Sequence, residues 1–180
     1  MIVVVGDLRA DGRPSSATAI AAHVAALGSV VEIVGLVPGD AGGDRRLIEF
    51  AAQGVGHAAV LRSPGEALEA ADLELALRYL PGVGTIVLVD DGRGELLTTA
   101  AAAAAWGAAG LIVVAPGGAG TSGLPATALV LQPPTSDPEG TFAGFVAALA
   151  IRLAAGEESA GALRSTIAAL AVDPLGAEPA

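Results

Sequence analysis

The chain has 180 residues, of which 53% are hydrophobic but only 3% aromatic, and it carries a formal net charge of −10 at pH 7. It has no Cys, Lys or Asn, and all nine basic residues are Arg, which excludes disulfides, cysteine–zinc sites, thiol and Schiff-base chemistry and lysine-based phosphate loops. Because so acidic a chain offers no basic patch, we expect neither nucleic acid nor an anionic membrane as a partner.

A chain of this length suits one domain with a hydrophobic core. We therefore predict a single domain over residues 1–172, followed by a tail at residues 173–180. The N-terminus lacks the basic segment of a secretory signal, and the uncharged run Leu97–Ala115 is broken by Gly107 and Gly110. These features predict a cytoplasmic protein in which this run forms a buried helix followed by a buried strand.

The first half of the chain alternates short apolar runs with helix signals. An all-apolar run such as Ile2–Val5 is typical of a parallel strand buried on both faces. Ser63 followed by Pro64 is typical of a helix cap and first helical position. The elements predicted here are a strand at Ile2–Val5, a helix from Ser15 or Ser16 to Leu27, a strand at Val30–Val37, a helix at Asp44–Gln53, a strand at His57–Leu61 and a helix from Ser63 to Leu80.

The second half repeats the same alternation and closes with two helices. The elements predicted here are a strand at Thr85–Val89, a helix at Glu95–Trp106, strands at Leu111–Val114 and Ala126–Leu131, and helices near Asp137–Ala155 and Glu157–Ala171. Strands that alternate with helices of this length indicate a parallel sheet covered by helices. The sequence therefore predicts the α/β class, a three-layer α/β/α arrangement with a mainly parallel sheet of about six strands.

Several short motifs follow one another in a recognisable order. They are Val3–Asp11, Val34–Gly42, Gly54-Val55, Gly110–Gly120 and the pair Phe142–Phe145 and Ala160–Ala171. In this order they resemble the ribokinase/PfkB family of sugar and nucleoside kinases. The resemblance implies a ribokinase-like core, ATP and Mg as cofactors, and a small hydroxyl-bearing molecule as substrate.

The resemblance also implies positions for a binding site. Asp11, Ser15 and Asp40 correspond to substrate-binding positions, and Asp11 ends a motif whose last residue contacts sugar hydroxyls in the family. The residues that correspond to the nucleotide side are Gly117, Gly118, Gly120 and Gly140. For Asp11 a turn or cap role is the alternative, and for Asp40, which lies in a Gly-rich segment, a turn is the simpler interpretation.

Departures from the family pattern bear on catalysis. The strands that form the family's lid are missing after Asp11, and a chain without Asn cannot hold the family's Mg-linked Asn-x-x-Glu motif. Where the family carries Gly-Ala-Gly-Asp, this chain reads Asp137-Pro-Glu-Gly140 when aligned on Phe142. The position of the catalytic Asp is therefore Gly140, which has no proton acceptor.

Acidic residues supply the remaining candidates. Asp90 and Asp91 follow a predicted strand, where carboxylates and waters can hold Mg²⁺, although Asp-Asp-Gly is also ordinary turn sequence. Glu139 is a candidate displaced base. Ser136-x-x-Glu139 also matches a capping box. We expect the negative charges of Asp137 and Glu139 to interact favourably with the positive end of the helix dipole and to repel phosphate.

Three hypotheses follow from these residues. The first is a degenerate, lidless ribokinase-like protein without phosphotransferase activity that retains binding of a small molecule such as a sugar or nucleotide. The second is an active sugar or nucleoside kinase with a rearranged base, and the third is a structural or partner-binding module. Because a missing lid would leave a sheet edge uncovered, we also expect a homodimer.

Overall fold

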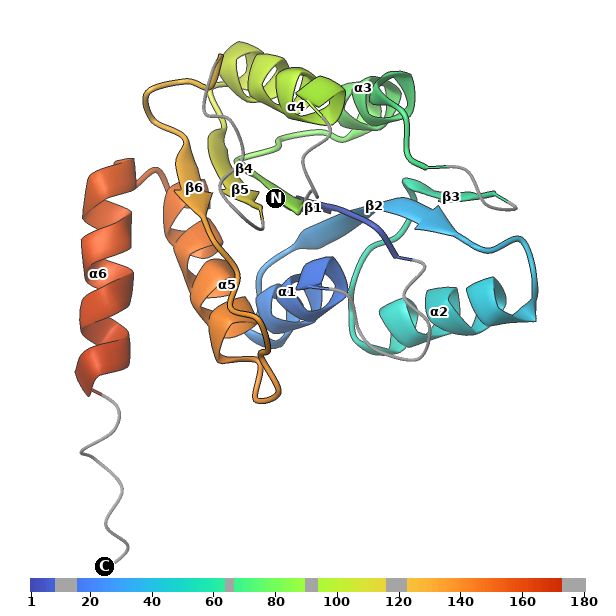
Figure 1. Ribbon diagram of the computed structural model, residues 1–180, viewed down its shortest axis with the longest axis horizontal. Helices are drawn as coiled ribbons and strands as arrows, with labels where there is room; N and C mark the ends of the chain where they lie inside the picture. Colours follow the sequence, from blue (N-terminus) through green and yellow to red (C-terminus); the bar gives the residue numbers. More distant parts are fainter. Residues whose placement is uncertain (9–15, 64–66, 90–93, 116–122, 173–180) are drawn as a thin grey trace, which may run out of the picture.

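The computed structural model describes residues 1–8, 16–63, 67–89, 94–115 and 123–172. This part of the chain forms six strands and six helices, which alternate up to β5 and end in β6, α5 and α6 (Figure 1). They are β1 (Ile2–Val5), α1 (Ser16–Ala26), β2 (Val31–Val37), α2 (Ala41–Ala52), β3 (Val60–Arg62), α3 (Ala70–Tyr79), β4 (Thr85–Val89), α4 (Gly94–Gly107), β5 (Gly110–Val114), β6 (Leu129–Leu131), α5 (Thr141–Ala154) and α6 (Ser159–Val172).

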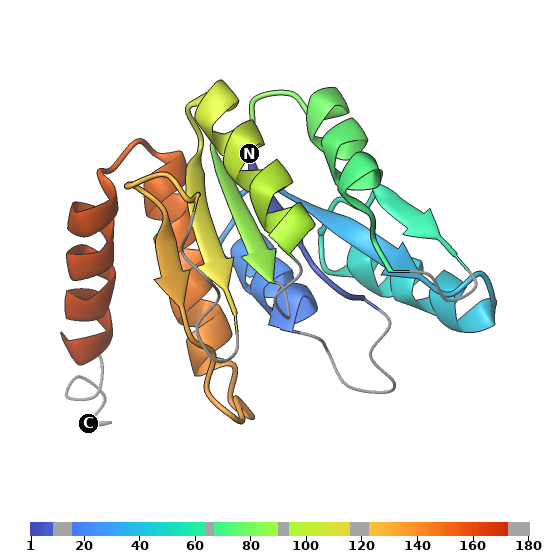
Figure 2. The same cartoon turned by 45° about the horizontal axis from the view of Figure 1, so that its top comes forward.

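The six strands form one sheet in the order β3-β2-β1-β4-β5-β6. Every neighbouring pair is parallel, and in the centre Ile2 of β1 lies between Val31 of β2 and Thr85 of β4. Figure 2 shows the strands running in one direction beneath their covering helices. The predicted three-layer α/β/α fold with a six-strand parallel sheet is confirmed.

Successive side chains of each strand point to opposite faces of the sheet and pack into two separate hydrophobic cores. Ile2 and Val4 of β1 pack with α1, α5 and Phe50 of α2, whereas Val3 and Val5 pack with α3 and α4. All four β1 side chains are buried, as the all-apolar strand predicts. α6 lies outside this arrangement and packs on α5 (Figure 1).

Gly35 allows the chain after β1 to cross close to β2. A Cβ atom at Gly35 would lie 2.3 Å from the carbonyl oxygen of Gly6 and 2.7 Å from the side chain of Leu8. Leu8 is buried at this point, with 2% of its surface exposed. Gly35 therefore lets Gly6 and Leu8 pack directly on β2 where the chain leaves β1.

Two elements on the β3 side begin later than the sequence predicts. β3 was expected at His57–Leu61, but the amide of Val60 donates to the carbonyl of His57 in a turn, so the strand starts at Val60. The predicted helix start at Ser63 is wrong, because the amide of Ser63 bonds to the carbonyl of Val37 and extends the pairing with β2. α3 instead begins at Ala70.

A short strand and a late helix also differ at the other end of the sheet. The strand predicted at Ala126–Leu131 is confined to Leu129–Leu131, because the amide of Ala128 bonds to the carbonyl of Pro125 in a turn. α6 begins at Ser159, with the carboxylate of Glu158 accepting from the amides of Ala160 and Gly161. These two hydrogen bonds lower the pKa of Glu158 below its ordinary value.

The long uncharged run of the sequence folds as a helix followed by a buried strand, but the prediction of a buried helix is wrong, because one side of α4 is exposed and Trp106 has 94% of its surface exposed. α4 ends at Gly107, Ala108 takes a left-handed conformation with φ of 51°, and β5 begins at Gly110. No helix in the described ranges has the length and apolar character to cross a bilayer. The tail predicted at residues 173–180 lies outside the described residues.

Candidate functional site

The strand order of the sheet reverses between β1 and β4. These strands are neighbours, yet the helices that follow them, α1 and α4, cover opposite faces of the sheet (Figure 1). In open parallel sheets, ligands bind at the carboxyl edge where the strand order reverses in this way. The segments that follow β1 and β4 both start at this edge.

Most of the predicted ligand-binding residues belong to the segments that leave this edge. Asp11 and Ser15 follow β1, and Asp90 and Asp91 follow β4. The glycines Gly117, Gly118 and Gly120 follow β5, the neighbour of β4. All seven residues lie outside the described residues, so their roles stay predictions. Among the described residues, no group of three His, Asp or Glu side chains could hold a metal ion.

Asp40 is described, and its carboxylate has a structural partner. It precedes α2 as the N-cap residue, and its Oδ1 atom accepts hydrogen bonds from the amides of Gly42 and Gly43 at 2.8 and 3.2 Å. An N-cap carboxylate satisfies amides that have no partner within the helix. The geometry accounts for Asp40 by helix capping, and α2 begins at Ala41, three residues before the predicted start at Asp44, so the segment expected to be a turn includes the first turn of the helix.

The first turn of α5 is the position that the resemblance assigns to phosphate and the base. α5 begins at Thr141, and the side chain of Asp137 folds against its N-terminus. One carboxylate oxygen accepts from the amide of Phe142 at 3.1 Å, and the other accepts from the amide of Ala143 at 3.0 Å. A carboxylate of the chain itself thus occupies the amides and the positive dipole end that a bound anion would use.

The predicted capping box at Ser136 and Glu139 is wrong. The helix starts at Thr141 instead of near Asp137, so both residues lie ahead of its first turn. Glu139 is exposed and forms no hydrogen bond or ion pair with another described residue. Asp137 was noted in the sequence only as a negative charge, and its capping role was missed because its bonds reach five and six residues forward.

Gly140 occupies a conformation and a space that exclude a larger residue. It has φ of 70°, in the left-handed region that favours glycine. A Cβ atom at this position would lie 2.7 Å from the Nε2 atom of His23, which comes from α1. The position that corresponds to the catalytic Asp of the kinases is therefore closed by the packing of α1 against α5. No sequence pattern links His23 to Gly140.

Cationic groups are also distant from this turn along the helix. The only Arg of α5 is Arg152, in the last turn, where it pairs with Glu157 at 3.0 Å. Phosphoryl transfer depends on positive charge or metal at the transferring phosphate and on a positioned base. The first turn of α5 itself carries no Arg, and the two proton acceptors beside it, the Asp137 carboxylate and the His23 imidazole of α1, cap the helix and pack against Gly140.

Removing the cap tests the role of Asp137. We expect Asp137→Ala to lower the free energy of unfolding by about 1–2 kcal/mol, because two amides of α5 lose their acceptor. The matched controls are Ser136→Ala and Glu139→Ala, which a capping box would make costly. We expect each control to change stability by less than about 0.5 kcal/mol in urea unfolding. A larger loss of unfolding free energy in the controls than in Asp137→Ala would show that Ser136 and Glu139 form the capping box after all.

Comparisons with known proteins identify the fold. Neither a protein-family model nor a curated protein sequence matches the chain. Its structure is similar to that of a protein called Sa239, with a TM-score of 0.63 and 11% identity over 99% of this chain and 95% of that one.

Two kinases show the same similarity. A protein described as ribokinase II of E. coli, in complex with ATP and Mg²⁺, has a TM-score of 0.60 and 13% identity over 92% of this chain and 89% of that one. Aminoimidazole riboside kinase of Salmonella enterica has a TM-score of 0.56 and 12% identity over 92% and 89%. The chain therefore has the ribokinase-like α/β/α fold, which it shares with these kinases over nearly its whole length.

Proposed function

We propose that this chain is a ribokinase-like protein that does not transfer phosphate and that binds a small hydroxyl-bearing molecule, such as a sugar or nucleoside. The observation that carries the first half is the N-terminus of α5, where the carboxylate of Asp137 holds the amides of Phe142 and Ala143. A phosphate group at this turn would have to displace a carboxylate and then face its charge.

The absence of a base at Gly140 supports the same conclusion. General-base catalysis needs an acceptor within hydrogen-bond reach of the attacking hydroxyl. Gly140 has no side chain, and the imidazole of His23 takes the space that a carboxylate would need. Glu139, the candidate displaced base, is exposed and precedes the helix. The alternative of an active kinase would require a base from another segment.

The topology supports the second half of the proposal. β1 and β4 form the point at which an open sheet binds ligands, and Asp11, Asp90 and Asp91 lie in the segments that follow these two strands. Carboxylates accept hydrogen bonds from hydroxyl groups, which makes a polyol or a ribose a suitable ligand class. Binding here does not require the α5 N-terminus.

Two assays on the full chain test the proposal. The first incubates the protein with Mg-ATP and a panel of sugars and nucleosides and measures ADP; we expect no formation above the protein-free control. The second measures the thermal midpoint with each panel member, and we expect a rise with at least one, because a ligand that binds only the folded state stabilises it.

Two isosteric variants test which carboxylate binds the ligand. We expect Asp11→Asn to abolish the rise in thermal midpoint, whereas Asp40→Asn, which keeps the cap of α2, retains it. Protein-dependent ADP formation that Glu139→Gln abolishes would establish the active-kinase alternative instead. No rise with any sugar, nucleoside or nucleotide would remove the binding half of the proposal.

A further inference from the structure

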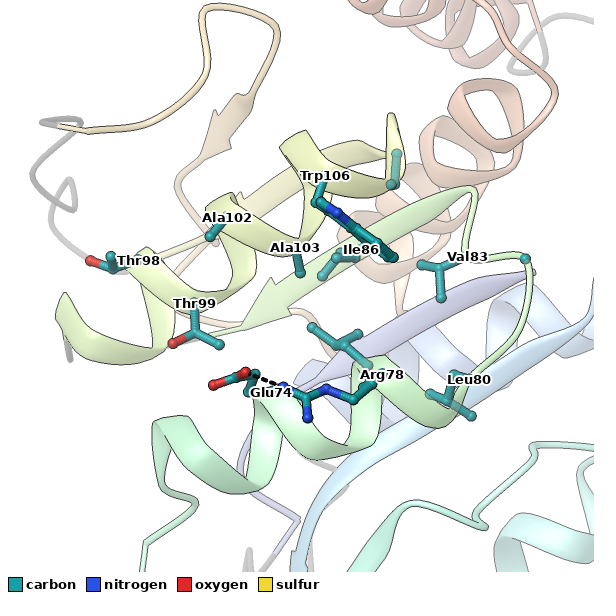
Figure 3. Close-up of a pocket in the computed structure, with 14 residues that line it drawn as sticks. Glu74, Arg78, Leu80, Val83, Ile86, Thr98, Thr99, Ala102, Ala103 and Trp106 are labelled. Carbon is teal, nitrogen blue, oxygen red and sulfur yellow. Dashed lines mark hydrogen bonds and ion pairs between the residues drawn. The ribbon is translucent and has the colours of Figure 1, made fainter.

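A groove lies between α3 and α4, over the beginning of β4, and has a volume of about 640 Å³. Figure 3 shows α4 along one side, α3 along the other, and Ile86 of β4 between them. Leu80 and Val83, which line one end, directly precede β4. The groove is therefore near the amino ends of the strands and on the face opposite α5, away from the carboxyl edge and the proposed ligand site.

The side of α4 that borders the groove is apolar and uncovered. Trp106 lines the groove with 94% of its surface exposed, and Ala102 and Thr98 are exposed one and two turns earlier on the same helix. Glu95 is the only charged residue among the 14 of α4. A helix at a protein surface normally turns charged residues outward, and a contiguous apolar patch marks an interaction site.

The charge of the groove favours a second copy of the chain as its occupant. Its lining holds one acid and one base, Glu74 and Arg78, which pair at 2.6 Å across one turn of α3 (Figure 3). The whole chain carries −10, so two copies repel one another least through a face of no net charge.

The extent of the surface suits a small interface. The groove is lined by 14 residues, and the exposed side chains of Leu75, Tyr79 and Ala105 lie on the same two helices. Together these residues are fewer than the about 20–30 that a standard protein–protein interface uses from each partner, which agrees with a dimer that dissociates on dilution. Trp is enriched among the residues that dominate binding energy in such interfaces, especially where it fills a pocket.

We propose that two copies of this chain associate through their α3–α4 faces, with the indole of Trp106 of each copy placed in the groove of the other. The contact is isologous, because each copy offers the same apolar groove and the same protruding indole. This surface differs from the uncovered sheet edge that the sequence suggested for a homodimer. It also leaves the carboxyl edge of the sheet open for a ligand.

Light scattering together with tryptophan fluorescence tests the proposal on the full chain. We expect a mass of twice 17.4 kDa at high concentration that falls to 17.4 kDa on dilution. Because the chain has a single Trp, its emission reports this surface alone, and we expect a blue shift that follows the dimer fraction. A mass that stays at 17.4 kDa, or a dimer whose emission is that of an exposed indole, would overturn the proposal.

A matched pair of variants locates the contact. Ala102 of α4 and Ala168 of α6 are both exposed on helices, and Glu is a good helix former at either position. We expect Ala102→Glu to weaken association at least tenfold by placing like charges together, and Ala168→Glu to leave it unchanged. Thermal unfolding at low concentration checks that both monomers fold alike.

A variant of opposite charge shows whether Ala102→Glu weakens association through charge repulsion or by disrupting the contact surface. We expect a mixture of Ala102→Glu and Ala102→Arg to associate again, because the two changes place opposite charges together. If Ala168→Glu dissociates the dimer and Ala102→Glu does not, the contact belongs to α6. If the chain is monomeric and an apolar dye shifts the Trp106 emission, the groove is a small-molecule pocket; either result contradicts the proposal.

Discussion

Substituting Gly140 is expected to destabilise the fold by about 2–5 kcal/mol, with Asp or with Ala, and Asp is expected to restore no kinase activity. A side chain in the left-handed region costs about 1–2 kcal/mol, and forced overlap in a packed region adds about 1–3 kcal/mol. The overlap arises because a Cβ atom would approach the Nε2 atom of His23 to 2.7 Å. Urea unfolding of Gly140→Ala and Gly140→Asp measures the cost.

The control for this change is the neighbouring glycine of the same helix. Gly144 lies inside α5, and a Cβ atom there would meet His23 at 3.7 Å, an ordinary contact. We expect Gly144→Ala to stabilise the fold by about 0.5–1 kcal/mol, because Gly is unfavourable within a helix. Adding His23→Ala to Gly140→Asp should recover part of the lost stability. Equal effects at both glycines would contradict the assigned geometry.

Truncating Leu149 is expected to lower the free energy of unfolding by about 3–5 kcal/mol, as for fully buried leucines in general. Leu149 lies on the face of α5 that enters the core, with 0% of its surface exposed. The loss combines the transfer of the removed methyl groups with the cavity that remains, since Val146 and Leu153 on the same helix are fixed by their own packing.

The matched control is Leu27→Ala. Leu27 follows α1 and has 58% of its surface exposed, so we expect a change below about 1 kcal/mol. Guanidinium unfolding of both variants gives the comparison. A loss below about 1 kcal/mol for Leu149→Ala would mean that α5 is not anchored in the core, and the placement of its N-terminus beside His23 would then lack support.

The strands at the centre of the sheet could be predicted from the sequence because their signal is local. β1 and β4 have the bounds that their apolar runs indicate, Ile2–Val5 and Thr85–Val89. A strand buried on both faces needs apolar residues throughout, and few other arrangements produce such a run. The order of motifs added the family resemblance, and the structural comparisons confirm the ribokinase-like fold.

The site could be predicted only in part because its decisive contacts are not local. The assignment of Gly140 to the position of the family's catalytic Asp came from the sequence resemblance and stays a prediction. The contact of Gly140 with His23 depends on how α1 packs against α5, which no local pattern encodes. The bonds of Asp137 span an irregular turn instead of the spacing of a capping box. The α3–α4 groove likewise depends on helix separation, and the uncharged run of α4 was predicted to be buried instead of exposed beside it.

The amide resonances of Phe142 and Ala143 test the central claim most directly. If the Asp137 carboxylate holds both amides, adding Mg-ATP or inorganic phosphate should leave their ¹⁵N and ¹H chemical shifts unchanged in an NMR titration. In Asp137→Ala the same amides should shift when Asp137 is removed, before any ligand is added. A saturable shift of these two amides in the unmodified chain would show that phosphate displaces Asp137, and would contradict a phosphate position closed by the protein itself.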